Sequence, residues 1–333
     1  MNIIMDAMGG DNAPEAIVKG SIEALREYDV KITFSGKEEE IKKYLNIEKN
    51  LLNRIEIINA EDVITNEDKP VKAIRKKKDS SMVKGMNALK DGFGDAFVSA
   101  GNTGAILSGG LFIVGRLPGI ERPCLAPLFP NGERFSLLMD AGANVDCKPL
   151  FLNQFALMGS IYMENVLKIE NPKVGLINIG TEEGKGNKLV NDTFKLLKES
   201  ELNFIGNIEA RDILSNDADI LVCDGFVGNV VLKLMEGVVS ELMGRMKNEI
   251  LKTTKGKIGG YLIKDSMKRL KDKLDYSEHG GAPLLGLKAP VIKAHGSSDS
   301  TAIKNAIRQS KIFLDSGVNE IIKEELDRGG NDN

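Results

Sequence analysis

The chain has 333 residues, of which 42% are apolar, with 45 basic and 48 acidic side chains and a formal net charge of -3. This composition is ordinary for a globular protein and argues against a general nucleic-acid-binding surface. Two histidines are too few for a histidine-rich metal site, and three cysteines without a Cys-x-x-Cys pair suit a reducing compartment better than a disulfide framework or a zinc site.

Short apolar runs alternate with helix-like stretches along the chain, which is the pattern of a parallel sheet covered by helices on both faces. The predicted strands are residues 3–6, 31–35, 54–59, 96–100, 135–140, 174–179, 204–208, 220–223 and 291–294. The predicted helices are residues 14–27, 38–44, 70–91, 103–114, 149–166, 185–199, and from 298 to the carboxyl end. Because no repeat or linker interrupts this pattern, we expect a single α/β catalytic unit over residues 1–333. No run reaches 18 apolar residues, so we also expect a cytoplasmic protein.

One region, residues 227–276, departs from the alternation. Apolar residues recur at helical spacing from Val227 to Ile250, and residues 247–273 then carry nine Lys or Arg against three acids. The apolar residues Ile258, Leu262 and Ile263 interrupt this basic stretch. Two interpretations stay open: a helical protrusion that forms a subunit interface with a membrane-contacting tip, or a core helix followed by a solvated basic loop.

Gly-rich segments stand where predicted strands give way to helices. They are Asp6-Ala-Met-Gly-Gly-Asp-Asn-Ala-Pro14, Ser99-Ala-Gly-Asn-Thr-Gly-Ala105, Asn178-Ile-Gly-Thr-Glu-Glu-Gly-Lys-Gly-Asn187, Asp224-Gly-Phe-Val-Gly-Asn229 and Ala294-His-Gly-Ser-Ser298. In an open parallel sheet such turns gather at the carboxyl ends of the strands, where ligands bind. Backbone N–H groups at helix starts bind anions, so we expect an enzyme that handles phosphate or another small oxyanion.

None of these segments matches a nucleotide-binding motif. No Gly-x-Gly-x-x-Gly follows the first strand, and residues 180–186 are one residue too short for a phosphate loop and carry glycine in place of its Ser or Thr. No Gly-x-Ser-x-Gly elbow is present either, so a nucleophilic triad has poor support. The chemistry that remains is one in which the enzyme only has to bind its substrates and polarise the reacting group.

Several residues of the Gly-rich segments are candidates for anion contact. Asn102, Thr103 and Gly104 can aim amide, hydroxyl and backbone donors at one point, and Lys185 is the best cation candidate because its glycine neighbours allow close approach. The alternative for residues 102–104 is a purely structural turn, and the alternative for Lys185 is an exposed surface lysine without a function. The other candidates, for which helix capping or a structural role is the alternative, are Asp6, Gly9, Gly10, Asp11, Asp224, Asn229, His295, Ser297 and Ser298.

The segments that begin at Asp6, Ser99 and Asp224 are followed by Gly280-Gly-Ala-Pro-Leu-Leu-Gly286, which leads to Ala294-His-Gly-Ser-Ser298. Taken together and in order, these segments closely resemble the phosphate acyltransferase (PlsX) family of bacterial phospholipid synthesis. The resemblance spans nearly the whole chain. It implies transfer of a fatty acyl group from acyl carrier protein to inorganic phosphate, giving acyl phosphate for glycerolipid synthesis. It also implies a Rossmann-like fold akin to phosphotransacetylases and to isocitrate and isopropylmalate dehydrogenases, a homodimer, and peripheral association with the inner face of the cell membrane.

The chemistry of that reaction agrees with the candidates. Phosphate is already a nucleophile at neutral pH, so orientation and oxyanion stabilisation suffice and we expect no metal or redox cofactor. We predict Lys185 and Asn229 as the catalytic residues and the other candidates as the phosphate-binding residues. Five basic residues are predicted either to dock the acidic carrier protein or to form a solvated helix face: Arg75, Lys76, Lys77, Lys78 and Lys84. The downstream glycerol-phosphate acyltransferase is a further expected partner. The rival interpretations are a nicotinamide- and metal-dependent dehydrogenase and a non-catalytic scaffold.

Overall fold

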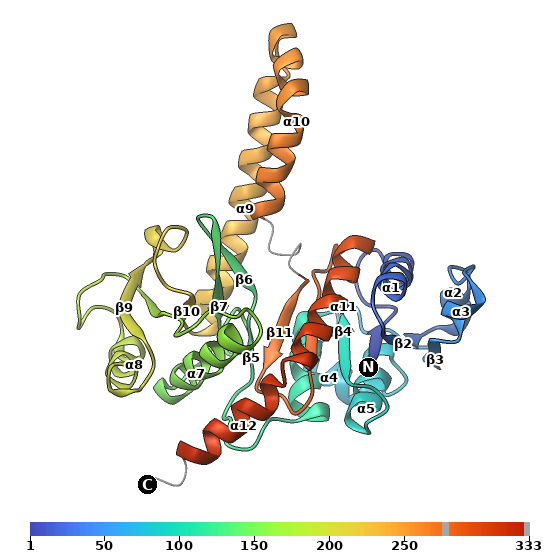
Figure 1. The fold of residues 1–333 in the computed structure, drawn as a ribbon, viewed down its shortest axis with the longest axis horizontal. Helices are drawn as coiled ribbons and strands as arrows, with labels where there is room; N and C mark the ends of the chain where they lie inside the picture. The colour runs from blue at the N-terminus through green and yellow to red at the C-terminus, as the bar shows by residue number, and fades with distance from the viewer. Residues whose placement is uncertain (275–279, 330–333) are drawn as a thin grey trace.

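A computed structural model describes residues 1–274 and 280–329. The chain forms two sheets, each covered by helices, and a long helical hairpin that stands away from both (Figure 1). The predicted class, mostly parallel strands with covering helices, is therefore confirmed, with the strands divided between two sheets.

The first sheet has seven strands in the order β3-β2-β1-β4-β12-β11-β5. Five strands are parallel: β1 (Asn2–Asp6), β2 (Lys31–Gly36), β3 (Ile55–Asn59), β4 (Ala96–Ser99) and β12 (Val291–Lys293). Antiparallel β11 (Ala282–Leu285) and β5 (Cys124–Leu125) complete one edge.

Side chains alternate across the first sheet and so cover both of its faces. Ile3 and Met5 pack in the core that includes α1 (Glu15–Glu27) and α11 (Ser300–Asp315), whereas Ile4 packs in the core that includes α5 (Ser81–Lys90). The sheet's other helices are α2 (Glu38–Lys42), α3 (Lys49–Leu52), α4 (Pro70–Lys76), and α6 (Thr103–Gly109) continued by the π-helix η1 (Gly110–Val114).

The second sheet has the order β6-β7-β10-β8-β9, and only β6 is antiparallel. Its strands are β6 (Leu128–Asn131), β7 (Arg134–Met139), β8 (Val174–Asn178), β9 (Phe204–Glu209) and β10 (Ile220–Val222). Its helices are α7 (Pro149–Asn165), α8 (Lys188–Glu199), the short 3-10 helix η2 (Ala210–Asp212) and α12 (Val318–Gly329), which packs on α7. One hydrophobic cluster contains Phe97 of the first sheet and Leu221 of the second, so the two sheets share a core.

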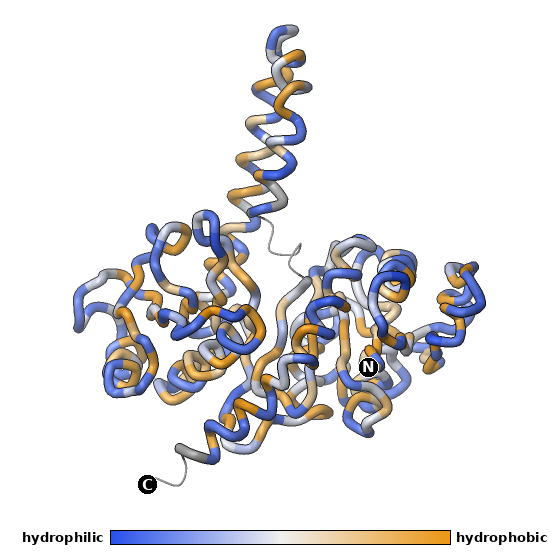
Figure 2. The backbone as a smooth tube through the Cα atoms, in the orientation of Figure 1, coloured by the Kyte–Doolittle hydropathy of each residue, from blue (hydrophilic) through white to orange (hydrophobic). Residues whose placement is uncertain are grey.

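The hairpin consists of α9 (Gly225–Ile250) and α10 (Thr254–Leu274), and hydrophobic residues recur along both helices (Figure 2). The basic stretch is therefore mostly helical in the structure, whereas the subunit interface and the membrane-contacting tip stay predictions. Residues 254–274 are helical despite their glycines. Glycine is required at residue 256, where a Cβ would lie 1.9 Å from the carbonyl oxygen of Ile250. In the described part of the chain, no helix is both long and apolar enough to cross a membrane.

Other predictions were wrong at element boundaries. The helix predicted over residues 70–91 is two helices, because Ser80 accepts a hydrogen bond from the backbone N–H of Val83 and starts α5 anew. The carboxyl-terminal helix breaks at Gly317, whose φ is 62°. Strands β5, β6 and β11 have four residues or fewer and were missed.

Asp140 follows β7 and has no solvent exposure. Its carboxylate accepts hydrogen bonds from the backbone N–H groups of Leu125 (2.9 Å), Ala143 (3.1 Å) and Asn144 (2.6 Å), and from the Asn144 side-chain amide (2.9 Å). Burial raises the pKa of Asp140 to about 6, because the loss of hydration outweighs these donors.

We expect the contribution of Asp140 to stability to fall as the pH rises. Between the unfolded and the folded pKa the folded state binds more protons, so the free energy of unfolding decreases by roughly 3 kcal/mol across pH 4 to 7. The measurement is urea unfolding of the wild type and of Asp140→Asn, which does not titrate. The difference in stability, wild type minus variant, should fall with pH. A difference that rises with pH would mean that the hydrogen bonds dominate over burial.

Candidate active site

Three Gly-rich loops meet at the carboxyl edge of the first sheet because β1, β4 and β12 are neighbouring parallel strands. The backbone N–H of Asp11 donates to the carbonyl oxygen of Gly296 (2.8 Å), and the Asn12 amide donates to the carbonyl oxygens of Ser297 (3.1 Å) and Ser298 (3.2 Å). Gly10 has a φ of 101°, and a Cβ there would lie 3.0 Å from the carbonyl oxygen of Gly296. The turn thus requires glycine.

Two predicted phosphate-binding residues hold these loops in shape. Asp6 is buried and accepts a 2.6 Å hydrogen bond from the Ser99 hydroxyl, and burial raises the pKa of Asp6. A Cβ at Gly9 would lie 2.6 Å from this carboxylate. The Asn102 amide oxygen caps α6, accepting from the backbone N–H of Ala105 (2.9 Å), while its nitrogen donates to the carbonyl oxygen of Thr65 (3.0 Å).

The first two residues of α6, which come directly after the cap residue Asn102, are also predicted phosphate-binding residues. Thr103 and Gly104 are partly exposed at the start of the helix, and a Cβ at Gly104 would lie 2.6 Å from the ring of Pro70 on α4. Glycine therefore lets α4 approach the loop closely.

The other predicted residues lie at the carboxyl edge of the second sheet. Asp224 caps α9 by accepting from the backbone N–H of Val227 (2.8 Å). Asn229 lies on the first turns of α9, where a Cβ at Gly142 would come within 3.3 Å of its amide oxygen. Lys185 is exposed in the loop after β8, and its carbonyl oxygen accepts a hydrogen bond from the Asn178 amide (3.1 Å). Because β8 and β10 are neighbours, Lys185 and Asn229 follow adjacent strands.

Helix α9 connects the two groups of loops. Asn229, Lys233 and Glu236 stand at spacings of four and three residues and so share one face of the helix. The Glu236 carboxylate lies 2.7 Å from the Lys233 ammonium and 3.9 Å from Nε2 of His295, whose Nδ1 lies 2.9 Å from the Ser297 hydroxyl. Lys233 and Glu236 are not among the residues predicted from the sequence, although polar residues at this spacing in an apolar helix were a usable signal.

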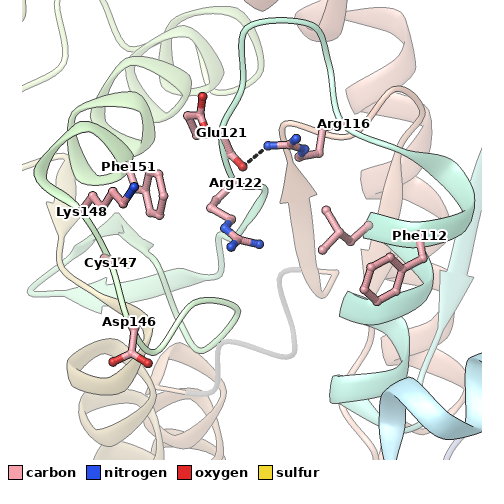
Figure 3. Close-up of a pocket in the computed structure, with 9 residues that line it drawn as sticks. Phe112, Arg116, Glu121, Arg122, Asp146, Cys147, Lys148 and Phe151 are labelled. Atoms are coloured by element: carbon pink, nitrogen blue, oxygen red, sulfur yellow. Dashed lines mark hydrogen bonds between the residues drawn. The ribbon is translucent and has the colours of Figure 1, made fainter.

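A cleft of about 670 Å³ opens between η1 and the start of α7, within the size range of small-molecule sites (Figure 3). Its lining residues are Leu111, Phe112, Arg116, Glu121, Arg122, Asp146, Cys147, Lys148 and Phe151. The guanidinium of Arg122 lies 5.9 Å from the ring centre of Phe151. Burial raises the pKa of Cys147 to about 12, so its thiol stays protonated and is no nucleophile. No motif marked this cleft, because its residues come from separate segments.

The predicted carrier-docking residues are divided by the structure. The Lys77 ammonium lies 2.8 Å from the Asp68 carboxylate and 3.7 Å from that of Asp62, and Lys84 pairs with Asp79. The remaining three are exposed: Arg75, Lys76 and Lys78. The Arg75 guanidinium lies 5.7 Å from the ring centre of Phe112, at the rim of the cleft.

The fold is that of the phosphotransacetylases and of a related dehydrogenase. A phosphotransacetylase from Streptococcus pyogenes is 17% identical with a TM-score of 0.59, covering 96% of this chain and 94% of its own. A 4-hydroxythreonine-4-phosphate dehydrogenase from Klebsiella pneumoniae is 12% identical with a TM-score of 0.51, covering 94% of this chain and 99% of its own. These likenesses show the fold alone.

Sequence comparison defines the family. The family model described as "Fatty acid synthesis protein" matches residues 1–321. A phosphate acyltransferase from Clostridium botulinum (strain Loch Maree / Type A3) is 53% identical over 98% of each chain, and one from Alkaliphilus oremlandii (strain OhILAs) is 52% identical over 100% of this chain and 99% of its own. The chain belongs to the phosphate acyltransferase family and is a transferase enzyme. The dehydrogenase and scaffold interpretations are set aside.

Proposed function

We propose that this enzyme transfers a long-chain acyl group from acyl carrier protein to inorganic phosphate, forming acyl phosphate for glycerophospholipid synthesis. The observation that carries the proposal is the approach of the first sheet's His295 loop to α9, where Nε2 of His295 lies 3.9 Å from the Glu236 carboxylate. We call this contact between the His295 loop and α9 the seam. Family membership supports the reaction class, and the approach of the His295 loop to α9 supports our choice of this region as the oxyanion site.

In the proposed reaction a phosphate oxygen attacks the thioester carbonyl carbon, the carbon–sulfur bond breaks, and the carrier thiolate leaves and takes up a proton. Asn229 and Lys185 orient phosphate and stabilise the negative charge that develops on the carbonyl oxygen. His295, Ser297 and Ser298 complete the anion pocket, together with the loop containing Gly9, Gly10 and Asp11 and with the donors around Asn102, Thr103 and Gly104. We expect no metal or redox cofactor.

The cleft beside η1 is our candidate for the donor's thioester arm. Its walls combine the rings of Phe112 and Phe151 with the positive charges of Arg122 and Lys148, which suits an apolar chain on a phosphorylated linker. The exposed Arg75 side chain lies against Phe112 of this cleft, and exposed Lys76 and Lys78 follow it in the chain. Their charges favour an acidic carrier surface. Lys77 and Lys84 contribute less, because carboxylates already pair with them.

Donor competition tests this proposal. Palmitoyl thioesters of acyl carrier protein and of coenzyme A are compared at equal concentration in the presence of phosphate, with release of the thiol as the readout. Preference for the carrier protein that weakens with salt and in Arg75→Glu/Lys76→Glu supports the proposal. Equal use of both donors, or preference for coenzyme A, contradicts the carrier assignment and leaves phosphate acyl transfer in place.

We propose that α9 forms a homodimer interface. Large apolar side chains stand exposed at every fourth position along it: Phe226, Val230, Leu234, Val238, Leu242 and Met246. We expect Leu234→Glu/Val238→Glu to change the sedimenting species from dimer to monomer, because charges would be buried at the contact. The control is Glu249→Gln, also exposed on α9. A wild-type monomer, or a variant that still dimerises, would contradict the proposal.

We propose that the hairpin contacts the inner face of the cell membrane, where a glycerol-phosphate acyltransferase could receive the product. Ile258 is 62%, Leu262 76% and Ile263 42% exposed on α10, among basic residues. Replacing all three with glutamine should lower association with anionic liposomes about tenfold or more, because apolar insertion is lost. The control is Phe93→Gln, which removes an exposed apolar side chain elsewhere. Flotation unchanged in the triple variant would refute membrane contact through α10.

A further inference from the structure

Lys293 is a cation at the carboxyl edge of the first sheet that sequence reasoning did not single out. It is the last residue of β12 and stands in register with Ser99, whose hydroxyl holds Asp6. Its side chain is partly buried, and its ammonium donates a 3.3 Å hydrogen bond to the carbonyl oxygen of Ala294. Lys293 therefore lies on the strand that leads directly into the His295 loop.

The charges facing Lys293 come from α9. Lys233 disfavours its protonated form and Glu236 favours it, but loss of hydration is the largest influence and lowers the pKa of Lys293 to about 8. Glu236 also lies 2.7 Å from Lys233 and 3.9 Å from His295. The Glu236 carboxylate thus lies near Lys233 and His295, and its charge favours the protonated form of Lys293. Lys233 and Lys293 repel each other, and a bound anion would relieve this repulsion.

A second observation concerns the loop that follows β12. The Ser298 hydroxyl, at the end of the loop that follows Lys293, is buried and has no hydrogen-bond partner among the described residues. A buried hydroxyl without a partner loses a hydrogen bond that a bound oxyanion can restore. The neighbouring Ser297 hydroxyl is exposed beside the His295 ring. Hydroxyls and ammonium groups together are the donor set of a phosphate site.

We infer that Lys293 and Lys233 bind a phosphate group from opposite sides of the seam between β12 and α9. This inference rests on the proposed function for the identity of the phosphate, which is either the acceptor or the phosphodiester of the donor's arm. Asn229 and Lys233 lie about one helical turn apart on α9. If the bound group is the acceptor phosphate, Lys233 therefore holds it beside the predicted catalytic amide of Asn229. Glu236 then orients Lys233 and His295 and makes no contact with the anion.

Steady-state kinetics of Lys293→Met and Lys233→Met test the inference. If the bound group is the acceptor, the KM for inorganic phosphate rises about tenfold or more and the KM for the acyl donor stays the same. A rise confined to the donor KM assigns the group to the donor's arm. Lys293→Arg should recover part of the phosphate affinity. The control is Lys288→Met, an exposed lysine in the connection between β11 and β12.

Calorimetric titration of the donor-free protein with inorganic phosphate provides a readout apart from turnover. The wild type and Lys288→Met should bind phosphate, and the two lysine variants should bind it at least tenfold more weakly. Lys233 has a side chain that is 57% exposed, so its replacement tests the site even if Lys293→Met does not fold. Unchanged phosphate and donor KM values in Lys233→Met and in folded Lys293→Met would overturn the inference. Phosphate binding without phosphate-dependent turnover would leave the site standing and reject the proposed function.

Discussion

Gly228→Ala is expected to lower the free energy of unfolding by about 3 kcal/mol or more, or to prevent folding. A Cβ at Gly228 would lie 1.9 Å from the carbonyl oxygen of Asp140 and 2.9 Å from its carbonyl carbon. Both obstacles are backbone atoms, and the loop that contains them is fixed by the buried Asp140 carboxylate. Helix α9 can therefore cross this loop only where it has no side chain. Urea unfolding, followed by circular dichroism, measures the effect.

Two matched variants on the same helix separate this clash from the general effect of alanine. Apart from the surrounding backbone of α9 itself, no atom of the described residues lies within 4 Å of a Cβ added at Gly237 or at Gly244. Replacing either with alanine should stabilise the protein by roughly 0.5–1 kcal/mol, because alanine loses less backbone entropy in a helix. If Gly228→Ala were as stable as these two variants, α9 would not cross the Asp140 loop as described.

Asn229→Ala and Lys185→Ala are each expected to reduce turnover about 100-fold while the protein stays folded. Asn229 is exposed on α9 against Gly142, and Lys185 is exposed after β8, so neither side chain contributes to the core. Removing a donor that stabilises the developing oxyanion lowers kcat more than it raises KM. Initial rates of thiol release at saturating phosphate and acyl donor measure the effect.

The controls are an asparagine and a lysine from the same segments. Asn248→Ala lies on the far part of α9, and Lys188→Ala lies at the start of α8 with a side chain that is 89% exposed. Both should keep wild-type turnover. Full activity in folded Asn229→Ala and Lys185→Ala would remove these residues from the catalytic step. A similar loss in the controls would show that the effect is not specific to them.

Local sequence patterns predicted most strands and most helices because apolar periodicity and turn chemistry are local properties of the chain. The apolar run of β1 ends at Asp6, and the glycines after it are required by backbone approaches that only three neighbouring strands create. The start of α5 was missed, although serine, the residue at position 80, is a preferred helix N-cap. The region predicted as a possible helical protrusion, residues 227–276, is divided into α9 and α10, and Gly256 allows the start of α10 to lie close to the Ile250 carbonyl oxygen.

The site was predictable only in part for a related reason. The loops at Gly10, Gly101 and Gly296 are marked by their glycines, but His295 also lies near Glu236, on a helix predicted from its apolar residues. Lys293 is the last residue of β12, and the role proposed for it depends on α9, which is distant in sequence. The cleft beside Phe112 depends on how η1 and α7 face each other, which no local pattern encodes.

The most direct test of the central claim is to incubate the purified protein with palmitoyl acyl carrier protein, with and without inorganic phosphate. Release of the carrier thiol is followed by a thiol reagent, and the product by phosphorus NMR. We predict that release requires phosphate and that acyl phosphate appears in equal amount. Thiol release that is independent of phosphate, or no release by the folded protein in the presence of phosphate and liposomes, would contradict the account.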